Sequence, residues 1–313
     1  MSVGRDRTPN TSLTGALCEL AAGFDGRLSV AAVNMRTQEE ALLDADQVWG
    51  TASTIKLAIL AELFRQVRAG QLLLSTRVAL QRGDQVGGSG ILKDVQPDLQ
   101  LTLQDLATLM VVLSDNTATT MLISVVGGVA PVNACMRDYG LDSITLHRPV
   151  SFEHVGDDVR RLGEANARDL MRFAVLLGKE ELVDAASSQQ MLAILRRQQY
   201  LDQVPRFFDY NPFAVELGAK QELVVACKTG FFPGTRADVG LLSDAEGPLV
   251  AYCVMSQEAT DRSMGVDNAG SVVVGLAGRL LLQAWWSGPV PPLQDLPNPA
   301  QRLLQTQASR SAI

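Results

Sequence analysis

The stretch from Ser53 to Ala69 constrains the fold more than any other part of the chain. It has helical spacing, and apolar side chains occupy nearly every position of its first half: Ile55, Leu57, Ala58, Ile59, Leu60, Ala61, Leu63 and Phe64. A helix that is apolar on all sides is stable in water only when other elements cover it all round. The chain must therefore enclose this helix, and Lys56 is enclosed with it.

The segments around this helix predict both strands and helices. Five runs predict strands, at residues 26–35, 40–50, 222–230, 235–243 and 248–255. The last three are separated by short links, which favour an antiparallel meander. Helical spacing dominates between the two groups of strands, and residues 272–286 predict a final helix that covers one face of the sheet.

Composition excludes several classes of protein. The 313 residues are 47% hydrophobic and 19% charged, which is enough to fill a large core without metals or disulfides. The net charge of -7 argues against a nucleic-acid partner, because such proteins usually carry a basic face. No apolar run is long enough to cross a membrane. No signal sequence is recognised, so the chain with this sequence is expected to be cytoplasmic. An exported protein that had lost its N-terminal signal would show the same sequence.

The four cysteines do not suggest a disulfide framework or a metal site. They are scattered through apolar stretches without a C-x-x-C pair, at Cys18, Cys135, Cys227 and Cys253. Cysteines in such surroundings are usually buried thiols. No cofactor is expected, and the oligomeric state is left open.

A serine and a lysine share one face of the enclosed helix. Ser53 and Lys56 are three positions apart, so their side chains lie about 5–6 Å apart and the amine can reach the hydroxyl. A serine hydroxyl needs a neighbouring base to become a nucleophile. A lysine in an apolar site loses part of its preference for the charged form, so it can accept a proton near neutral pH.

The pair by itself is a weak signal, since about 0.3 such matches arise by chance in a chain of this composition. Two further triplets strengthen it. Ser114-Asp115-Asn116 interrupts a helical run, and Lys228-Thr229-Gly230 ends a predicted strand. Together the three motifs are expected by chance only about 10⁻⁴ times.

With these motifs the chain resembles the serine β-lactamases and penicillin-binding proteins, which carry S-x-x-K, S-D-N and K-T-G in this order. The stretch GSGILKDVQPDLQLTLQDLATLMVVLSDNTATTML, residues 88–122, is similar to class A β-lactamases, and the resemblance covers residues 12–286. It implies an α/β (α+β) fold of the β-lactamase/DD-peptidase type, with an antiparallel sheet flanked by helices and an all-helical lobe. The lobes implied are 12–52 with 218–287 for the sheet and 53–217 for the helices. The proline-rich residues 288–313 are expected to be mobile.

The resemblance also implies catalytic roles. Ser53 would be the acylated nucleophile and Lys56 its base or proton relay. Ser114 would pass a proton to the leaving nitrogen, while Asn116 would hold a substrate amide.

Further residues would bind the substrate. Lys228 and Thr229 would dock an anionic carboxylate, and Gly230 would let the substrate approach the strand. The amides of Ser53 and Phe231 would form the oxyanion hole. Arg236 resembles the carboxylate-binding arginine of many class A enzymes; the alternative is an exposed strand arginine.

The chain departs from the class A pattern where the second chemical step needs a base. Class A enzymes release the acyl group with a glutamate in an E-x-x-L-N loop, and no such motif is present; the family spacing points near Val150. Glu153 is the closest acid, while Asp157, Asp158 and Glu164 are alternatives. Without a positioned base, deacylation is expected to slow by about 10² to 10⁴, so the protein would trap β-lactams.

Other reaction classes fit less well. A Ser-His-Asp triad would need His147 or His154 to reach Ser53, which no G-x-S-x-G motif surrounds. Two histidines without an H-x-H-x-D cluster cannot supply the usual zinc site. The expected function is a serine hydrolase that acylates Ser53 and hydrolyses small-molecule β-lactams. The alternatives are a D-alanyl-D-alanine peptidase or esterase, and a slowly deacylating penicillin-binding protein or sensor.

Overall fold

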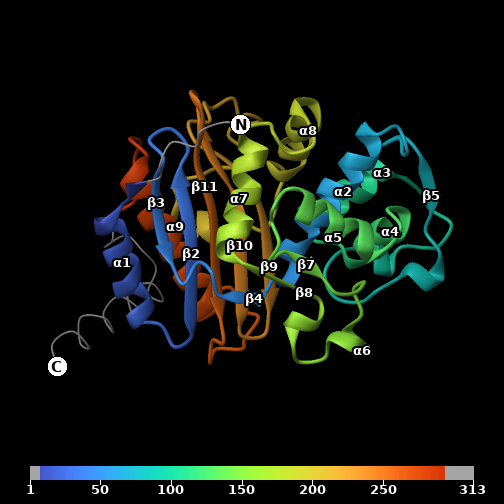
Figure 1. Ribbon diagram of the computed structural model, residues 1–313, viewed down its shortest axis with the longest axis horizontal. Coiled ribbons are helices and arrows are strands. Elements are labelled where there is room, and N and C mark those ends of the chain that lie inside the picture. The colour runs from blue at the N-terminus through green and yellow to red at the C-terminus, as the bar shows by residue number, and fades with distance from the viewer. Residues whose placement is uncertain (1–7, 293–313) are drawn as a thin grey trace.

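A six-stranded sheet forms the centre of the protein, whose computed structural model describes residues 8–292. The strand order is β1-β3-β2-β11-β10-β9, and Figure 1 labels its strands from β3 to β9. The strands are β1 (Thr8–Pro9), β2 (Arg27–Asn34), β3 (Glu39–Leu43), β9 (Val224–Phe232), β10 (Thr235–Asp244) and β11 (Gly247–Gln257). Strands β9 to β11 form the predicted antiparallel meander. The short β1 pairs with β3 in parallel, so the sheet is mixed.

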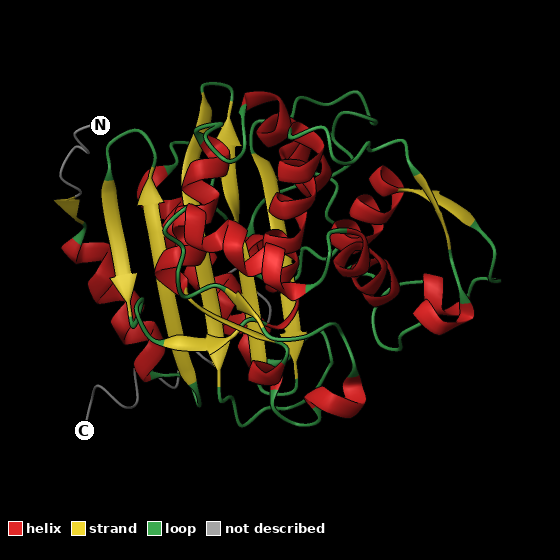
Figure 2. Cartoon of the chain, turned by 45° about the vertical axis from the view of Figure 1, so that its right-hand side comes forward, coloured by secondary structure: helices red, strands yellow, loops and turns green. Residues whose placement is uncertain are grey.

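Helices cover both faces of this sheet (Figure 2). Helices α1 (Thr11–Ala22) and α9 (Ala269–Trp285) pack on one face, and α7 (Ala167–Gly178) packs across β2, β10 and β11 on the other. Side chains alternate along a strand, and β2 therefore sends Val30 and Ala32 to the core beneath α1 and α9, and Ala31 and Val33 to the other core. The predicted final helix is thus confirmed as the cover of one face.

The remaining helices form a lobe beside β9, at the right of Figure 1. They are α2 (Lys56–Arg68), α3 (Leu103–Val112), α4 (Asn116–Val125), α5 (Val129–Asp138), α6 (Phe152–Val155) and α8 (Ala185–Leu195). Helix α2 is buried continuously from Lys56 to Phe64. The apolar run therefore forms the enclosed helix that the sequence predicts.

Short strands and 3₁₀ turns connect these layers. One small sheet has the order β4-β8-β7 and another joins β5 to β6. Their strands are β4 (Val48–Gly50), β5 (Arg77–Ala79), β6 (Gln100–Thr102), β7 (Thr145–Leu146) and β8 (Gly163–Asn166). The turns are η1 (Ala52–Ile55), η2 (Arg82–Asp84), η3 (Leu92–Asp94), η4 (Val159–Arg161) and η5 (Val204–Phe207).

Some expectations need adjustment. Helix α7 lies within the expected helical range 53–217 but packs on the sheet, because its buried side chains face the strands. Cys18 is exposed, whereas the other three cysteines are buried as expected. Of the tail 288–313, residues 293–313 lie outside the described residues. Within 8–292 no single helix is long and apolar enough to cross a membrane, although α4 and α5, bent by 81°, pass by length and composition as a pair.

Candidate active site

Ser53 lies in the 3₁₀ turn η1, immediately before α2, and not inside the α-helix as expected. Ala52 has a φ of 45°, a left-handed value that costs an ordinary residue about 1–3 kcal/mol. Gly230 of β9 faces this turn, and a Cβ there would lie 2.9 Å from the Ser53 amide nitrogen. The glycine was expected to admit the substrate; the structure shows that it admits the nucleophile's own turn against the strand.

Lys56 is fully buried at the start of α2. Its Nζ donates to the Ser114 carbonyl oxygen at 2.6 Å, to Ser114 Oγ at 3.0 Å and to Asn116 Oδ1 at 2.9 Å. Burial, and then the nearby ammonium of Lys228, hold the pKa of Lys56 well below its ordinary value. The lowered pKa makes it easier for Lys56 to lose a proton, and the amine that results has a lone pair that can accept one.

Ser114 links the two buried lysines. Its Oγ accepts from Lys56 Nζ at 3.0 Å and from Lys228 Nζ at 3.2 Å. Both bonds use oxygen lone pairs, so the hydroxyl proton of Ser114 is free to point at another group. Ser114 interrupts the helical run with a φ of 52°, which directs the chain from α3 into α4. The residue is strained and fully buried, as is common at functional sites.

Asp115 and Asn116 connect this break to a glycine-rich turn of sequence GGSGIL, residues 87–92. Asp115 caps α4 through the Ala118 amide, and its other oxygen accepts from the amides of Ile91 and Leu92 at 2.7 and 2.9 Å. Asn116 Nδ2 donates to the Gly87 carbonyl at 2.9 Å. The asparagine oxygen is therefore turned toward Lys56, which holds the side chain in one orientation.

Lys228 and Thr229 lie on β9 and are fully buried. Lys228 Nζ also donates to the Thr229 carbonyl at 2.6 Å, and burial lowers the pKa of Lys228 to about 7. The Thr229 hydroxyl is buried without a hydrogen-bond partner. Their docking of a substrate carboxylate stays a prediction; in this arrangement the Lys228 amine contacts the site through Ser114.

Arg236 is neither an exposed strand arginine nor free for a ligand. Its side chain is 3% exposed and donates to Ser271 Oγ at 3.1 Å and to three carbonyl oxygens, those of Phe232, Thr235 and Ser263. These bonds tie β10 to α9 and to the loop between β11 and α9. The guanidinium therefore has a structural role in the described protein, which argues against the predicted carboxylate contact.

Ser53 opens into a cavity of about 570 Å³. The cavity is lined by Ala52, Ser53, Gly88, Ser89, Asn116, Val150, Val155, Gly156, Asp157, Val159, Leu162, Tyr200, Phe231, Phe232, Pro233 and Met264. Ser53 and Phe231, whose amides are the predicted oxyanion hole, both belong to this wall. Within residues 8–292 the Ser53 hydroxyl makes no hydrogen bond, so it is available to a ligand.

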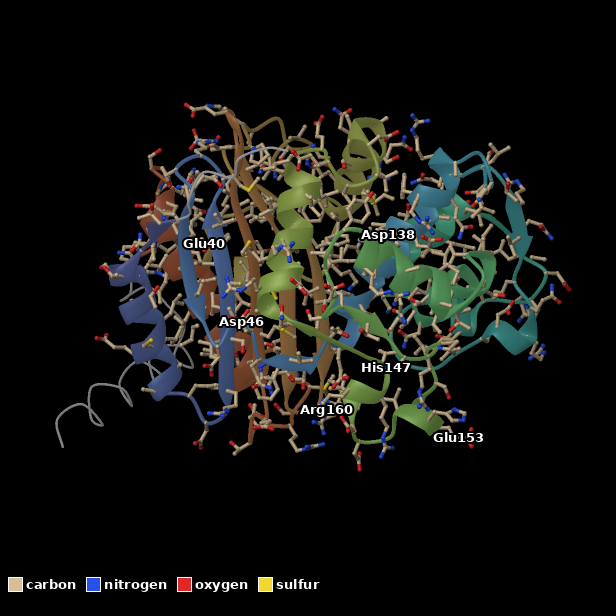
Figure 3. All side chains as sticks on the ribbon, in the orientation of Figure 1. Glu40, Asp46, Asp138, His147, Glu153 and Arg160 are labelled. Carbon is tan, nitrogen blue, oxygen red and sulfur yellow. The ribbon has the colours of Figure 1, made fainter. Side chains whose placement is uncertain are left out.

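The loop of residues 147–170 places only one acidic side chain in the wall of this cavity. Glu153, the closest acid by sequence, is exposed on α6 at the rim of the molecule, where Figure 3 labels it, and it does not line the cavity. Val150, where the family spacing points, does line it. Asp157 is the one carboxylate among the lining residues. The position of Glu153 outside the cavity wall therefore argues against it as the base, and Asp157, one of the alternatives from the sequence, becomes the stronger candidate.

The other polar groups of the loop are engaged elsewhere. Asp158 accepts three hydrogen bonds from Arg160, and this contact lowers the pKa of Asp158. Glu164 Oε2 pairs with His147 Nε2 at 2.9 Å, and the Nδ1 of His154 pairs with the Ser151 hydroxyl. Neither histidine lines the Ser53 cavity. Within the described range no group of three or more His, Cys, Asp and Glu side chains could hold a metal ion.

Two cavity residues have no signal in the sequence. Tyr200 packs edge-on against Phe231, with ring centroids 5.9 Å apart, and Met264 comes from the loop between β11 and α9. By contrast, the aromatic residues between 203 and 217 do not line the cavity. Of these, Phe207 is buried in the core under the sheet and Phe213 is exposed, while Phe208 and Tyr210 pack on that same core.

Comparison with known proteins agrees with this geometry. A model of the family described as the beta-lactamase enzyme family matches residues 12–285. The β-lactamase Toho-1 of Escherichia coli is 32% identical over 123 residues, which are 39% of this chain and only 42% of that protein. A β-lactamase of Bacillus licheniformis is 24% identical over 252 residues, covering 80% of this chain and 78% of the relative.

A solved structure extends the likeness to the whole fold. The β-lactamase from Sphaerobacter thermophilus superposes with a TM-score of 0.78 at 27% identity, and the match covers 90% of this chain and 100% of the other. The match therefore includes both the sheet and the helical lobe.

Proposed function

The chain belongs to the beta-lactamase enzyme family, and from this premise we propose that it hydrolyses β-lactams through an acyl-enzyme formed on Ser53. One observation supports this most: three separate segments of the chain bring Lys56, the pair Ser114 and Asn116, and Lys228 into one hydrogen-bonded cluster beside the cavity of Ser53. A nucleophile, a base and a proton donor around one hollow are the parts that acyl transfer needs.

Acylation begins when Ser53 Oγ attacks the lactam carbonyl carbon. Lys56 acts as the base in its neutral form, which keeps two of the three hydrogen bonds of Nζ and which the lowered pKa of Lys56 favours. It accepts the hydroxyl proton as the oxygen–carbon bond forms. The negative charge on the carbonyl oxygen is held by the amides of Ser53 and Phe231.

The leaving nitrogen is protonated by Ser114. As the carbon–nitrogen bond breaks, its electron pair stays on nitrogen, which takes the Ser114 hydroxyl proton. The hydroxyl regains a proton from Lys56, whose Nζ already donates to Ser114 Oγ at 3.0 Å. Across these steps one proton moves from Ser53 to the leaving nitrogen, and Lys228 stabilises the Ser114 oxygen while it is short of a proton.

Deacylation has less support. Water must attack the ester on Ser53 and lose a proton to a base, and Asp157 is the one carboxylate of the cavity wall. The Asp157 side chain is exposed, and its neighbours in the cavity wall from the same loop, Val150, Val155 and Val159, are apolar. We assign water activation to Asp157 and expect deacylation to be the slower step.

Incubation with benzylpenicillin, followed by intact-mass measurement over time, tests the function. The wild type should gain the mass of the drug within minutes and then lose it as the ring-opened product is released. Ser53→Ala should gain no mass, while Ser124→Ala, which changes an exposed serine on α4, should behave as the wild type. An adduct on Ser53→Ala would remove the nucleophile assignment. Wild-type cleavage of a D-alanyl-D-alanine peptide without any penicillin adduct would favour the peptidase.

A further inference from the structure

A serine of the glycine-rich turn shares a hydrogen-bond acceptor with the proposed base. The main-chain oxygen of Ser114 accepts from Lys56 Nζ at 2.6 Å and from the hydroxyl of Ser89 at 2.9 Å. Ser89 lies in the turn 87–92 and lines the cavity of Ser53. A carbonyl oxygen has two lone pairs, so this one is hydrogen-bonded twice, by an amine and by a hydroxyl.

The turn holds Ser89 firmly in this position. The Asn116 amide nitrogen donates to the Ser89 carbonyl at 3.0 Å, and Asn116 Nδ2 donates to the Gly87 carbonyl at 2.9 Å. Gly90 has a φ of 99° and lies so close to Asp115 that a Cβ there would be 2.3 Å from that side chain. The hydroxyl of Ser89 is therefore fixed beside the break between α3 and α4.

The ammonium form of Lys56 has as many donors as the site has acceptors. Its three N–H groups correspond to three oxygens, which are the carbonyl oxygen and Oγ of Ser114 and Oδ1 of Asn116. The neutral amine that accepts the Ser53 proton has only two N–H groups and one lone pair. One of the three oxygens must then lose Lys56 as its donor, and a buried oxygen without any donor is destabilising.

The three oxygens differ in what else donates to them. Among the described residues, Asn116 Oδ1 accepts from Lys56 alone. Ser114 Oγ has a second donor in Lys228, but its bond to Lys56 is the route by which the proposed mechanism returns a proton to this hydroxyl. The Ser114 carbonyl keeps the hydroxyl of Ser89 as its donor. It is therefore the oxygen that Lys56 can release at the lowest cost.

We propose that Ser89 is a positioning residue for acylation: its hydroxyl keeps the Ser114 carbonyl hydrogen-bonded while Lys56 turns its lone pair toward the nucleophile. This inference rests on the proposed acylation of Ser53 and names a residue that favours the neutral base. Ser89 acts through its neighbours and supplies no atom to the bonds that form or break.

Removal of the hydroxyl favours the protonated lysine. In Ser89→Ala the Ser114 carbonyl depends on Lys56 as its donor, and a hydrogen bond from an ammonium is stronger than one from a neutral amine. Loss of the proton is then harder, so the pKa of Lys56 should be higher in the variant than in the wild type.

The charged groups near Lys56 are the same in both proteins. Burial lowers the pKa of Lys56 most, Lys228 on β9 lowers it further, and Asp115 before α4 raises it. Asp157 is the one carboxylate in the wall of the adjoining cavity. Ser89→Ala changes none of them, so a comparison of the two proteins isolates the hydroxyl.

The pH dependence of acylation tests this role. Intact mass against time gives the second-order rate constant for the benzylpenicillin adduct, from about pH 6 to about pH 10. The rate should rise with pH as Lys56 loses its proton, and in Ser89→Ala this rise should lie about one pH unit higher. At pH values below the rise the variant should be about 10-fold slower, and above it the two rates should converge.

Two further variants separate the hydroxyl from the fold of the turn. Ser89→Thr keeps a hydroxyl at this position and should follow the wild-type profile. Ser124→Ala, which changes an exposed serine on α4, should do the same. Circular dichroism checks that all three variants are folded.

Each outcome decides one claim. A Ser89→Ala profile that is unshifted, or that is lowered by the same factor at every pH, overturns the positioning role and leaves the hydrolase intact. A Ser89→Thr profile that matches Ser89→Ala does so as well. No adduct on the wild type at any pH overturns the proposed function, and the role of Ser89 falls with it.

Discussion

The two sides of the Ser53 cavity are built differently. On the side of the helical lobe, Lys56, Ser114 and Asn116 are buried and joined by hydrogen bonds of 2.6 to 3.0 Å. On the side of the 150–162 loop, the lining is mostly aliphatic and its one carboxylate, Asp157, is exposed. A buried network holds its members in one geometry, whereas an exposed side chain on a loop samples several.

This contrast separates the two halves of the reaction. In the proposed mechanism the acyl-enzyme forms on the buried side, and its hydrolysis uses the side with a single exposed carboxylate. We therefore expect large effects from changes to the buried network and moderate effects from changes to the loop.

The largest effect is expected for Lys56→Met, which keeps most of the side-chain volume and removes the amine. Acylation by penicillin should slow by about 10³, because the base that takes the Ser53 proton is lost. Stopped mixing with intact-mass detection gives the rate, and circular dichroism checks the fold. Lys220→Met, at an exposed lysine, is the matched control. Acylation of Lys56→Met at the wild-type rate would contradict the role of the amine.

A smaller effect is expected for Asp157→Asn. Release of the acyl group should slow by about 10-fold to 10²-fold while acylation is unchanged, since only the water-activating carboxylate is removed. The decay of the penicillin adduct measures the first rate. Glu153→Gln, in the same loop but outside the cavity wall, should leave both rates unaltered. If the two variants decay alike, Asp157 is not the base.

The smallest effect concerns stability against pH. Unfolded lysine holds its proton to about pH 10.4, whereas burial lowers the pKa of folded Lys228 to about 7. Between these values the unfolded chain binds more protons, so the contribution of Lys228 to the free energy of unfolding rises with pH. Below about pH 7 Lys228 is charged in both states, so the whole cost of burying its charge lowers the free energy of unfolding.

Lys228→Met should remove this rise. Urea unfolding at pH 7.5 and 9.5 should show that the wild type gains stability relative to the variant, by up to about 1 kcal/mol per pH unit. The difference between the two proteins is the useful quantity, because burial raises the pKa of Cys227 and so acts in the opposite sense at high pH. A difference that does not vary with pH would contradict a neutral Lys228 in the folded state.

Much of this fold follows from local patterns in the sequence. The apolar run after Ser53 predicts the enclosed helix, and the three late strands with short links predict the meander. Thr102 and Asp105 form the capping box that begins α3. These features depend on near neighbours in the chain, and such patterns can be recognised without coordinates.

The site could be predicted only in part. The three motifs identify the residues that meet around Ser114. They do not show that the Arg236 guanidinium is hydrogen-bonded to α9 and to the preceding loop. They also miss Tyr200 and Met264, which reach the cavity from distant segments. The position of Glu153 in the sequence makes it the closest acid, but on α6 its side chain is exposed to solvent. Side-chain direction in an irregular loop depends on tertiary packing, which no local pattern records.

Rapid mixing of the wild-type protein with the chromogenic β-lactam nitrocefin tests the central claim most directly. The proposal is that the buried hydrogen-bonded cluster catalyses acylation and that a single exposed carboxylate catalyses the slower deacylation. Product should then appear in a burst of about one equivalent per protein, followed by a slower steady rate. A linear course without a burst, at a rate that Asp157→Asn does not change, would contradict the division between the two sides of the cavity.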